Sequence, residues 1–424
     1  MSERRRHRQD TPAVGGLAAI AAQALAISIE SLDGPLPADR VLAGFFRAHP
    51  KLGRRDRGLI AEAVFDVLRN RRRYAWLAQG GAGDTVRRLL LLSPAANALA
   101  RSPEESAWLA RLAGIDEASL PPAVRASLPD WLATALAVQY GAGRFEAITA
   151  SLLRPAPLDL RVNLLKGSRD EALAVLAADG IDAGPSPLAA TALRVRGKPA
   201  LERSRAFVDG LVEVQDAGSQ ALCAFAGPRR GQTVVDLCAG AGGKTLAMAA
   251  AMRSRGQVFA CDVSAARLAR LRPRLVRSGA SNVQPMRIES EVDPRLTRLR
   301  SRADLVLVDA PCSGTGTLRR NPDLKWRLAP DAIARLANQQ RAILGAASRL
   351  VKPGGVLVYA TCSLLEAENE AVAAWFDSDA GWQRRPAPAA FDAWCNERGE
   401  LRLSPERDDS DGFFAAAWSR AAGK

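Results

Sequence analysis

The second half of the chain alternates short apolar runs with longer stretches of helical periodicity. The apolar runs predict strands at 234–237, 257–262, 304–309 and 355–360. Helices are predicted between them, over 245–253, 265–277 and 331–350. Strands and helices that alternate in this way form a parallel, doubly wound sheet, which binds its ligands at the carboxyl ends of the strands. We therefore predict an α/β domain over residues 228–424.

The first 145 residues differ, because they show helical periodicity and almost no strand signal. Apolar residues recur at helical spacing in 14–29, 55–77, 107–112 and 131–139. A small α+β unit follows, with a strand at 158–163, a helix at 170–179 and alternating segments at 193–195 and 206–214. The sequence thus predicts three domains: an all-helical domain over 1–145, the α+β unit over 146–227 and the α/β domain over 228–424.

Positive charge is concentrated in the helical domain. Of the 59 Lys and Arg residues, 16 lie in the first hundred positions, where 9 Asp and Glu oppose them, and the whole chain carries a formal net charge of +14. Arginines cluster at 4–8, 54–57 and 69–73. Such clusters bind the phosphates of nucleic acids, although they also occur on solvated helix faces. We favour contact with RNA and keep the solvated face as the alternative.

The scarcity of histidine and the spacing of the cysteines exclude several kinds of site. His7 and His49 are the only histidines in the sequence. Two histidines are too few for a multi-histidine metal centre, and they make a hydrolase with a Ser-His pair improbable on composition. No two of the six cysteines are spaced as CxxC, which argues against zinc fingers and redox dithiols. The apolar run 14–29 is interrupted by Gly15, Gly16 and Gln23. We therefore expect an amphipathic helix there, no membrane segment, no metal ion, and a monomer in the reducing cytoplasm.

A glycine-rich loop follows the first predicted strand and opens a helix. It ends in Gly243-Lys244-Thr245, like the phosphate-binding loop of an NTPase. The first glycine of that motif would stand at position 238, which is Cys238, so the motif fails. The second strand ends in Asp262, where an acid binds the ribose hydroxyls in a nucleoside site. Loop and acid together indicate a nucleoside cofactor.

Two cysteines stand at matched positions after two buried strands. Cys312 follows Asp309 and the strand 304–309, and Cys362 lies fifty residues later, after the strand 355–360. If the helix 331–350 is the crossover between neighbouring parallel strands, both thiols lie at one edge of the sheet, facing the glycine loop. A single buried cysteine is most often an inert apolar residue. A matched pair beside a cofactor site indicates catalysis.

A cysteine nucleophile beside a methyl donor suits one reaction in particular. The C5 atom of a pyrimidine is a poor nucleophile until a thiolate adds at C6 and converts the ring into an enamine. C5 can then take a methyl group, after which a base removes its proton and the thiolate leaves. The reaction needs a nucleophile, an acid near the N3/N4 edge of the ring and a group that assists release. Cys362, Asp309 and Cys312 can supply that set without histidine.

Residues 150–424 resemble the RsmB/Sun (NOL/NOP/Sun) family of S-adenosylmethionine-dependent RNA cytosine-C5 methyltransferases. The matching stretches are 236–245, Asp262, Asp309-Ala-Pro-Cys-Ser-Gly-Thr-Gly, Asn321-Pro-Asp-Leu-Lys-Trp, Lys352-Pro-Gly-Gly, Tyr359-Ala-Thr-Cys-Ser and Asp411-Gly-Phe-Phe. The helical part, with 52–57 and 67–69, is similar to the NusB-like RNA-binding module of the bacterial rRNA members, and 158–166 to the family's RNA-recognition-motif-like insert. The resemblance implies a Rossmann-like methyltransferase domain, S-adenosylmethionine as cofactor and RNA as partner.

The resemblance also implies a role for each site residue. Cys362 would be the nucleophile, Cys312 would assist product release, and Asp309 would contact the target cytosine. Lys244 would lie near the active site, as the nearest cation able to lower the pKa of the nucleophile, and Asp262 would hold the ribose hydroxyls. The other residues expected around the cofactor are Cys238, Ala239, Gly240, Ala241, Gly242, Gly243, Lys244, Asp309 and Glu289. Glu289 stands where the family has an Asp near the adenine, and Ser290 is an equal alternative.

One motif departs from the family, and several functions stay open. The family loop usually reads Cys-Ala-Ala-Pro-Gly-Gly-Lys, whereas Gly240-Ala241 replaces Ala-Pro here, which should loosen the loop. Small-subunit rRNA is the favoured substrate and tRNA the alternative, because tRNA enzymes share the two-cysteine site. A non-catalytic RNA-binding assembly factor is disfavoured by the presence of both cysteines and Asp309. A P-loop NTPase is disfavoured by Cys238.

Overall fold

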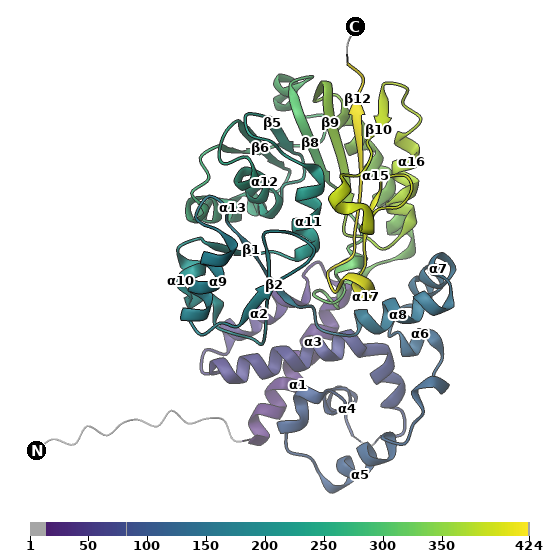
Figure 1. Cartoon of the computed structure of the whole chain (residues 1–424). Coiled ribbons are helices and arrows are strands. Elements are labelled where there is room, and N and C mark those ends of the chain that lie inside the picture. Colours follow the sequence, from purple (N-terminus) through teal and green to yellow (C-terminus); the bar gives the residue numbers. More distant parts are fainter. Residues whose placement is uncertain (1–13, 82, 423–424) are drawn as a thin grey trace, which may run out of the picture. The chain divides into compact units, whose positions relative to one another are not determined.

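The computed structural model describes residues 14–81 and 83–422, and the chain forms two compact units (Figure 1). The first, called here the helical unit, comprises the described residues up to Val138 together with Arg320–Leu328. The second, called the α/β unit, comprises Gln139–Arg319 and the described residues from Ala329 onwards. The predicted arginine cluster at 4–8, with His7, lies outside the described residues.

The helical unit is built around α3 (Arg54–Leu77), whose buried stripe explains why this segment is helical. Ile60, Ala63, Val64, Val67 and Leu68 recur at helical spacing and have no exposed surface. The unit's other α-helices are α1 (Val14–Glu30), α2 (Ala38–Ala48), α4 (Thr85–Leu91), α5 (Pro103–Leu112), α6 (Pro122–Arg125), the first turns of α7 (Asp130–Tyr140), and α14 (Leu324–Arg327). The described residues of this unit contain no strand, as the sequence pattern predicts.

Among the described residues, α1 is the one helix long and apolar enough to cross a membrane, over the window Gly16–Asp33. Its buried positions are Ala18, Ala21, Ala24, Leu25 and Ser28, which recur at helical spacing. The apolar ones belong to the core of the helical unit. A buried stripe of this kind is typical of an amphipathic helix that packs on a protein core.

A segment that follows Cys312 in sequence packs with the helices instead of the sheet. In α14, the Nζ of Lys325 donates to the Arg69 carbonyl at 2.7 Å, and the indole Nε1 of Trp326 donates to the Leu68 carbonyl at 2.7 Å. The Asp323 carboxylate accepts from the Ala38 N–H at 3.1 Å. The sequence pattern places 320–328 in the third predicted domain, whereas these bonds put the segment in the helical unit. The limits of the three predicted domains stay a prediction.

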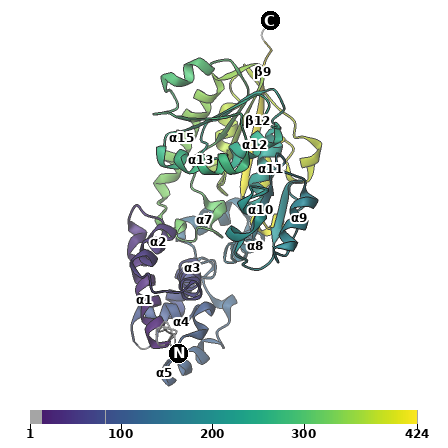
Figure 2. The same ribbon diagram turned by 90° about the vertical axis from the view of Figure 1, so that its left-hand side faces the viewer.

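The α/β unit begins with a small antiparallel sheet in the order β2-β3-β1-β4. Its strands are β1 (Leu158–Val162), β2 (Ala183–Pro185), β3 (Ala192–Val195) and β4 (Val212–Val214), and its helices are α8 (Ala142–Leu152), α9 (Arg169–Ala178), α10 (Arg205–Val208) and α11 (Ala217–Ala226). Helices α9 and α10 lie side by side (Figure 2). The alternating segment predicted at 206–214 is strand only in its second half. The first half is α10, because the Ser204 hydroxyl caps the Phe207 N–H and starts a helical turn.

The main sheet has eight strands, of which seven follow the order β10-β12-β9-β8-β5-β6-β7, while β11 pairs with β12. Its parallel strands are β5 (Thr233–Asp236), β6 (Gln257–Asp262), β7 (Val283–Arg287), β8 (Ala303–Asp309) and β9 (Val351–Thr361). The antiparallel edge consists of β10 (Trp382–Arg384), β11 (Leu401–Leu403) and β12 (Phe413–Arg420). The sheet, the small antiparallel sheet and the helical region confirm the predicted fold class.

Helices cover both faces of the main sheet, which explains why its strands read as continuous apolar runs. On one face, α15 (Pro330–Ser348) and α16 (Glu370–Phe376) pack on Val306, Val308 and Leu357. On the other face, α11 and α12 (Gly243–Ala251) pack on Val234, Leu305 and Val358. Helix α13 (Ala265–Ser278) covers β6, and α17 (Pro405–Asp408) precedes β12. The carboxyl ends of the parallel strands are left free to carry loops.

Candidate active site

Cys312 and Cys362 lie side by side beyond the carboxyl ends of β8 and β9. These strands pair in parallel with Asp309 opposite Ala360, so their loops leave the sheet next to each other. The two Sγ atoms are 3.4 Å apart. Gly316 permits this approach: its N–H donates to the Cys362 carbonyl at 2.9 Å, and a Cβ there would lie 2.3 Å from the Gly412 oxygen. The structure therefore brings together the two thiols that the sequence predicts at one edge.

The two thiols are not equivalent. The pKa of Cys312 is raised well above that of a free thiol, first by its hydrogen bond with Cys362, then by burial and by the charges of Cys362 and Glu368. Cys312 therefore keeps its proton at neutral pH and can donate it toward the sulfur of Cys362. Because attack requires a thiolate, Cys312 is the less suited of the two thiols to act as a nucleophile.

Lys244 and Asp309 form an ion pair next to the thiols. Lys244 is the second residue of α12, and its Nζ lies 2.7 Å from Oδ2 of Asp309. Burial opposes the charge of Lys244, but Asp309, Cys223 and Cys362 together raise its pKa above the ordinary value. Lys244 is therefore charged at neutral pH, and its hydrogen-bond partner is Asp309. Its ammonium also lies 5.5 Å from the centre of the Phe413 ring.

The glycine loop joins β5 to α12 through two residues in the left-handed region, Gly240 (φ +58°) and Gly242 (φ +82°). At Gly242 a Cβ would lie 2.1 Å from Leu271 Cδ1, so only glycine fits. At Gly240 no atom lies within 4 Å of that position, so the loop is open on this side. An open loop that leads into a helix N-terminus allows polar groups of a ligand to approach the backbone.

Asp262, the last residue of β6, is bonded to the backbone N–H of Gly240. Its Oδ2 accepts the Gly240 N–H at 2.8 Å and its Oδ1 accepts the Ser264 N–H at 2.7 Å. Arg267 approaches Oδ1 to 3.2 Å, and the Asp262 side chain is 2% exposed. The Oδ2 atom, which accepts one N–H, keeps capacity for a further hydrogen bond, whereas Oδ1 is already approached by both Ser264 and Arg267. Asp262 thus lies at the carboxyl end of β6 beside the glycine loop, and its contact with a ribose stays a prediction.

Asp236, the last residue of β5, is a buried carboxyl group beneath the glycine loop. Its Oδ2 accepts from the Thr245 hydroxyl at 2.6 Å, while its Oδ1 has no partner among the described residues. Burial raises the pKa of Asp236 to about 7, although the Thr245 hydrogen bond opposes the shift. A buried oxygen without a partner beside an open loop is a position that a polar ligand group or a water could satisfy.

Glu289 lies at the same strand edge but faces solvent. The Ile288 N–H donates to the Asp262 carbonyl at 3.2 Å, which brings the chain past β7 close to Asp262. The Glu289 side chain is 65% exposed and lies 3.4 Å from Arg295 and 3.6 Å from Arg287. The Glu289 backbone N–H donates to Asp293 at 2.7 Å. The structure therefore brings the backbone next to Glu289 close to Asp262, while the Glu289 carboxylate pairs with surface arginines.

Two arginines that the sequence argument did not single out bond the backbone of the glycine loop. Arg161 of β1 donates to the Gly243 carbonyl at 2.7 Å, and Arg274 of α13 donates to the Ala241 carbonyl at 2.6 Å. Burial lowers the pKa of Arg161 to about 10. Both guanidinium groups thus bond carbonyls of the loop and fix its backbone. Arg161 stands at a polar position of the alternating stretch 158–162, so the sequence pattern gives no signal that this arginine is buried.

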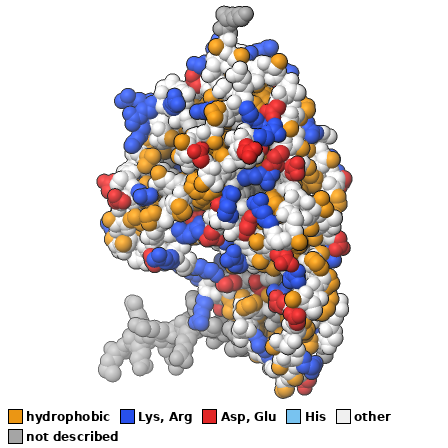
Figure 3. All heavy atoms as spheres, turned by 45° about the vertical axis from the view of Figure 1, so that its right-hand side comes forward, with side chains coloured by type: hydrophobic (Ala, Val, Ile, Leu, Met, Phe, Trp, Pro, Cys, Tyr) orange, Lys and Arg blue, Asp and Glu red, His pale blue; other side chains and the backbone are white. Residues whose placement is uncertain are grey.

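Arginines of the cluster at 69–73 contact other residues of the helical unit. Arg71 lies over the Trp326 ring at 5.6 Å, Arg72 donates to the Leu128 carbonyl at 2.7 Å and pairs with Asp130 at 2.7 Å, and Arg73 pairs with Glu117. In contrast, Arg54 and Arg55 are exposed. They border a groove of about 760 Å³ lined by Arg54, Arg55, Gly58, Leu59, Glu62, Pro94 and Ala95. On the face presented in Figure 3, Lys and Arg side chains are interspersed with Asp and Glu.

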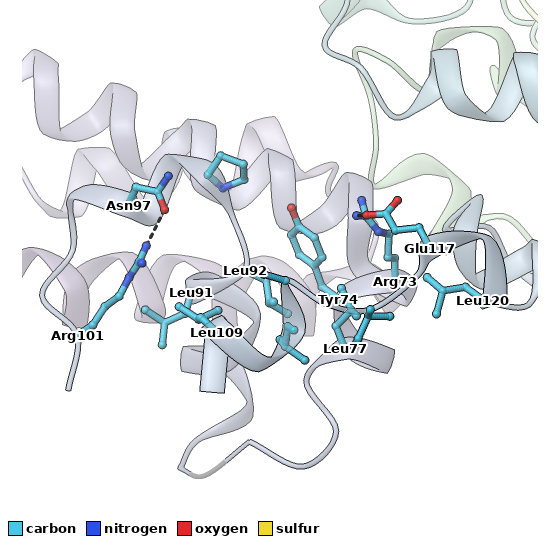
Figure 4. Close-up of a pocket in the computed structure, with 14 residues that line it drawn as sticks. Arg73, Tyr74, Leu77, Leu91, Leu92, Asn97, Arg101, Leu109, Glu117 and Leu120 are labelled. Atoms are coloured by element: carbon cyan, nitrogen blue, oxygen red, sulfur yellow. Dashed lines mark hydrogen bonds and ion pairs between the residues drawn. The ribbon is translucent and has the colours of Figure 1, made fainter. Parts of the chain in front are cut away.

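The helical unit also contains a separate cavity of about 430 Å³ (Figure 4). Leucines from α3, α4 and α5 line it, together with polar groups that pair with one another. Arg101 donates to Asn97 at 2.6 Å, and Arg73 pairs with Glu117. The cavity contains none of the predicted site residues. Within 14–81 and 83–422, no three His, Cys, Asp or Glu side chains are grouped as a metal site requires.

The chain combines a mostly parallel sheet with a glycine loop after β5, an acid at the end of β6 and two adjoining cysteines after β8 and β9. This combination is typical of a methyltransferase of the Rossmann type. Two family models match this chain. The model of 16S rRNA methyltransferase RsmB/F matches residues 224–419, and the RsmF/B-like ferredoxin-like domain matches residues 128–202. The small antiparallel sheet lies within the second match and the segment just after it.

Relatives agree with the family models. The chain is 36% identical over 306 residues to the probable ribosomal RNA small subunit methyltransferase B of Synechocystis sp., a match covering 70% of this chain and 67% of that protein. It is 38% identical over 296 residues to ribosomal RNA small subunit methyltransferase B of Sodalis glossinidius, covering 68% and 64%. The match spans about two thirds of each relative's length. The chain belongs to the RsmB/F family of methyltransferases, which confirms the resemblance that its motifs indicate.

Solved structures share the fold. The protein PH0851 superposes with a TM-score of 0.78 at 26% identity, over 95% of this chain and 99% of PH0851. A methyltransferase homolog protein from Pyrococcus horikoshii gives a TM-score of 0.62 at 28% identity, over 72% and 100%. NSun6 from Pyrococcus horikoshii gives 0.62 at 21% identity, over 70% and 99%.

Proposed function

We propose that this protein transfers a methyl group from S-adenosylmethionine to C5 of a cytosine in small-subunit rRNA, through a covalent bond between Cys362 and C6. The observation that carries the proposal is the pair of Sγ atoms, 3.4 Å apart, at the strand edge that also holds the Lys244–Asp309 ion pair. The names of the relatives support rRNA as the substrate class. An rRNA substrate in turn implies that the protein works in the cytoplasm.

The residues around the glycine loop fit S-adenosylmethionine. The loop is open at Gly240, the Asp262 carboxylate accepts the N–H of that glycine, and Asp236 Oδ1 has no partner among the described residues. Asp262 would accept a ribose hydroxyl. Residues 238–244 would line the methionine part, and Glu289 or Ser290 would be near the adenine. When bound, S-adenosylmethionine supplies the methyl group as an electrophile.

In the first half of the reaction, Cys362 and Asp309 act on the cytosine ring. The Cys362 thiolate adds to C6, and electron density moves to C5, which becomes nucleophilic. Asp309, held by Lys244 at 2.7 Å, would contact the N3/N4 edge of the ring. The ion pair fixes the orientation of the Asp309 carboxylate before the base arrives, which favours preorganised catalysis.

In the second half, the chain must release the methylated base. A base, which a water molecule can supply, takes the C5 proton, the electrons of the C5–H bond restore the C5–C6 double bond, and the electron pair of the C6–S bond leaves with the Cys362 sulfur. Cys312 is suited to assist this release because it keeps its proton and faces the Cys362 sulfur. A proton that passes from Cys312 to the departing sulfur would neutralise the thiolate as it leaves.

The helical unit would contribute contacts to the phosphates of RNA. The exposed Arg54 and Arg55 are the best candidates, because Arg71, Arg72 and Arg73 contact the unit's own residues. Phosphate contacts add affinity and salt dependence without sequence preference. The choice of the modified cytosine would then depend on the α/β unit.

The decisive experiment measures both the product and its position. Purified protein, labelled S-adenosylmethionine and 16S rRNA should give label in rRNA, and bisulfite sequencing of RNA from cells with and without this gene should find one or a few protected cytosines in rRNA. Protection in tRNA alone would contradict the rRNA assignment. If neither RNA is labelled although S-adenosylmethionine binds, the protein is an assembly factor with a methyltransferase fold. Thermal-shift titration with ATP tests the NTPase alternative.

A further inference from the structure

A buried polar cluster lies beneath the two cysteine loops, and none of the steps above uses it. At its centre is Glu368, the last residue of a short 3-10 turn, Glu366–Glu368, that follows the Cys362 loop. The Glu368 side chain has no exposed surface. Its polar neighbours are Ser313, Thr315, Gln340, Tyr359 and Ser363. These five residues and Glu368 are called here the Glu368 cluster.

The Glu368 carboxylate connects both cysteine loops. Its Oε1 accepts the Ser313 N–H at 2.8 Å, and Ser313 directly follows Cys312. Its Oε2 accepts the Ser363 hydroxyl at 2.6 Å, and Ser363 directly follows Cys362. The hydroxyls of Ser313 and Ser363 are themselves 3.1 Å apart. One side chain therefore fixes the residue after each thiol.

The rest of the cluster anchors Glu368 to the sheet and to its crossover helix. Gln340 of α15 donates to Oε1 of Glu368 at 3.0 Å and to the Pro311 carbonyl at 3.0 Å. Tyr359 of β9 donates from its hydroxyl to the Glu368 backbone carbonyl at 2.5 Å and lies 3.0 Å from Oε1 of Gln340. Both loops are thus tied to elements of regular structure, which move less than loops do.

We propose that Glu368 is a positioning residue that sets the separation and orientation of Cys312 and Cys362, a role that rests on the proposed two-cysteine chemistry. Without its carboxylate, the Ser313 N–H and the Ser363 hydroxyl would be buried without this acceptor. The two loops would then shift to find other partners. A displacement of reacting atoms by about 1 Å can lower a rate on the order of 100-fold.

Three variants separate this role from a general loss of stability. Glu368→Ala removes all three accepted hydrogen bonds. Glu368→Gln keeps the volume and one oxygen, so it tests the role even if Glu368→Ala fails to fold. Glu366→Ala is the matched control, because Glu366 belongs to the same turn and its side chain is exposed. Thermal unfolding of each variant verifies the fold.

The first measurement reports how close the two thiols lie to each other, and it does not require methyl transfer. A diazenedicarboxamide oxidises two neighbouring thiols: the Cys312 and Cys362 S–H bonds break, an S–S bond forms, and two protons and two electrons reduce the reagent to the hydrazine. The bond requires sulfurs that approach from 3.4 Å to about 2.05 Å. Mass spectrometry of the digested protein measures its rate of formation. We expect unchanged rates for Glu366→Ala, a roughly 3-fold decrease for Glu368→Gln and a decrease of 10-fold or more for Glu368→Ala.

The second measurement is the turnover of rRNA. We expect kcat to fall about 10-fold in Glu368→Gln and about 100-fold in Glu368→Ala, with the Kd of S-adenosylmethionine changed less than twofold. A purely structural role would instead lower the unfolding temperature and leave the kcat of the folded fraction intact. Wild-type cross-linking rates in folded Glu368→Gln overturn this proposal. Slow cross-linking in the Glu368 variants, combined with a wild-type protein that methylates no RNA, supports the positioning role and overturns the proposed function instead.

Discussion

The two halves of the sheet's carboxyl edge are built differently. At the β8–β9 end, buried hydrogen bonds fix the loops of Cys312 and Cys362, and Gly316 lies so close to its neighbours that no Cβ fits. At the β6–β7 end, Asp262 is buried, but Glu289 is 65% exposed and pairs with surface arginines. A reaction that depends on the placement of two sulfurs needs a rigid frame. On the proposed mechanism, S-adenosylmethionine would enter and leave with every turnover, which would need an open edge.

The largest expected effect concerns the rigid end and separates its two thiols. Cys362→Ala should abolish methylation and form no covalent complex with RNA, because no C6 adduct can form. In the Cys312→Ala variant, Cys362 should still add to C6 and the methyl group should still be transferred, but the base should be released slowly. A protein–RNA species should therefore accumulate and survive denaturing gels. That species should disappear in the Cys312/Cys362 double variant. A trapped species in Cys362→Ala but not in Cys312→Ala would show that the roles are reversed.

The second prediction concerns the buried acid at the cofactor end. Asp262→Ala removes the acceptor for the ribose hydroxyls, a loss of about 1.5–3 kcal/mol. Calorimetry should show the affinity for S-adenosylmethionine reduced roughly 10- to 100-fold. Because Asp262 also accepts the Gly240 N–H, Asp262→Asn is the control that keeps one oxygen for the loop. An unchanged affinity in Asp262→Ala would exclude Asp262 from the cofactor site.

The sequence predicted the regular part of this architecture well and its edges poorly. The apolar runs of β5, β6, β8 and β9 identify buried parallel strands, and their order places Cys312 beside Cys362. Strand β12 went unpredicted, because its alanine-rich sequence, Phe413–Arg420, has no clear alternation. Contacts between segments that are distant in sequence, such as the hydrogen bond from Lys325 Nζ to the Arg69 carbonyl, leave no local signal in the sequence either.

Glu368 shows the same limit within the site. Glu366, Glu368 and Glu370 stand in one acidic stretch that reads as exposed, yet Glu366 is exposed and Glu368 is fully buried. Only the approach of Ser313 and Ser363 from two other positions distinguishes the second glutamate. A side chain whose role depends on contacts from three separate segments cannot be recognised from its neighbours in sequence.

The third prediction extends the comparison to the helical unit, where buried and open arginines also contrast. Replacing Arg71, Arg72 and Arg73 together by Gln should lower the free energy of unfolding by about 1–3 kcal/mol, because contacts with Trp326, Asp130 and Glu117 are lost. Their effect on the salt dependence of RNA binding should be small.

The double variant of Arg54 and Arg55 to Gln is the matched test of the open surface. It should flatten the slope of log affinity against log salt by about 1.5 and leave unfolding nearly unchanged. If the slope changes in the triple variant and stays the same in the double variant, the arginines at 71–73 contact RNA and the contrast between the two groups is wrong.

The smallest expected effect belongs to the open end of the sheet. Because the Glu289 carboxylate faces solvent and pairs with Arg287 and Arg295, Glu289→Gln should change the affinity for S-adenosylmethionine less than about threefold, the size expected for an exposed contact. Ser290→Ala, measured alongside by calorimetry, tests the neighbouring alternative. A tenfold loss in Glu289→Gln would mean that its carboxylate leaves the arginines and turns toward the adenine when the cofactor binds. That result would mean that the β6–β7 end closes on its ligand. The two ends would then differ in when their side chains take up their positions: the cysteine end before binding, and the β6–β7 end during it.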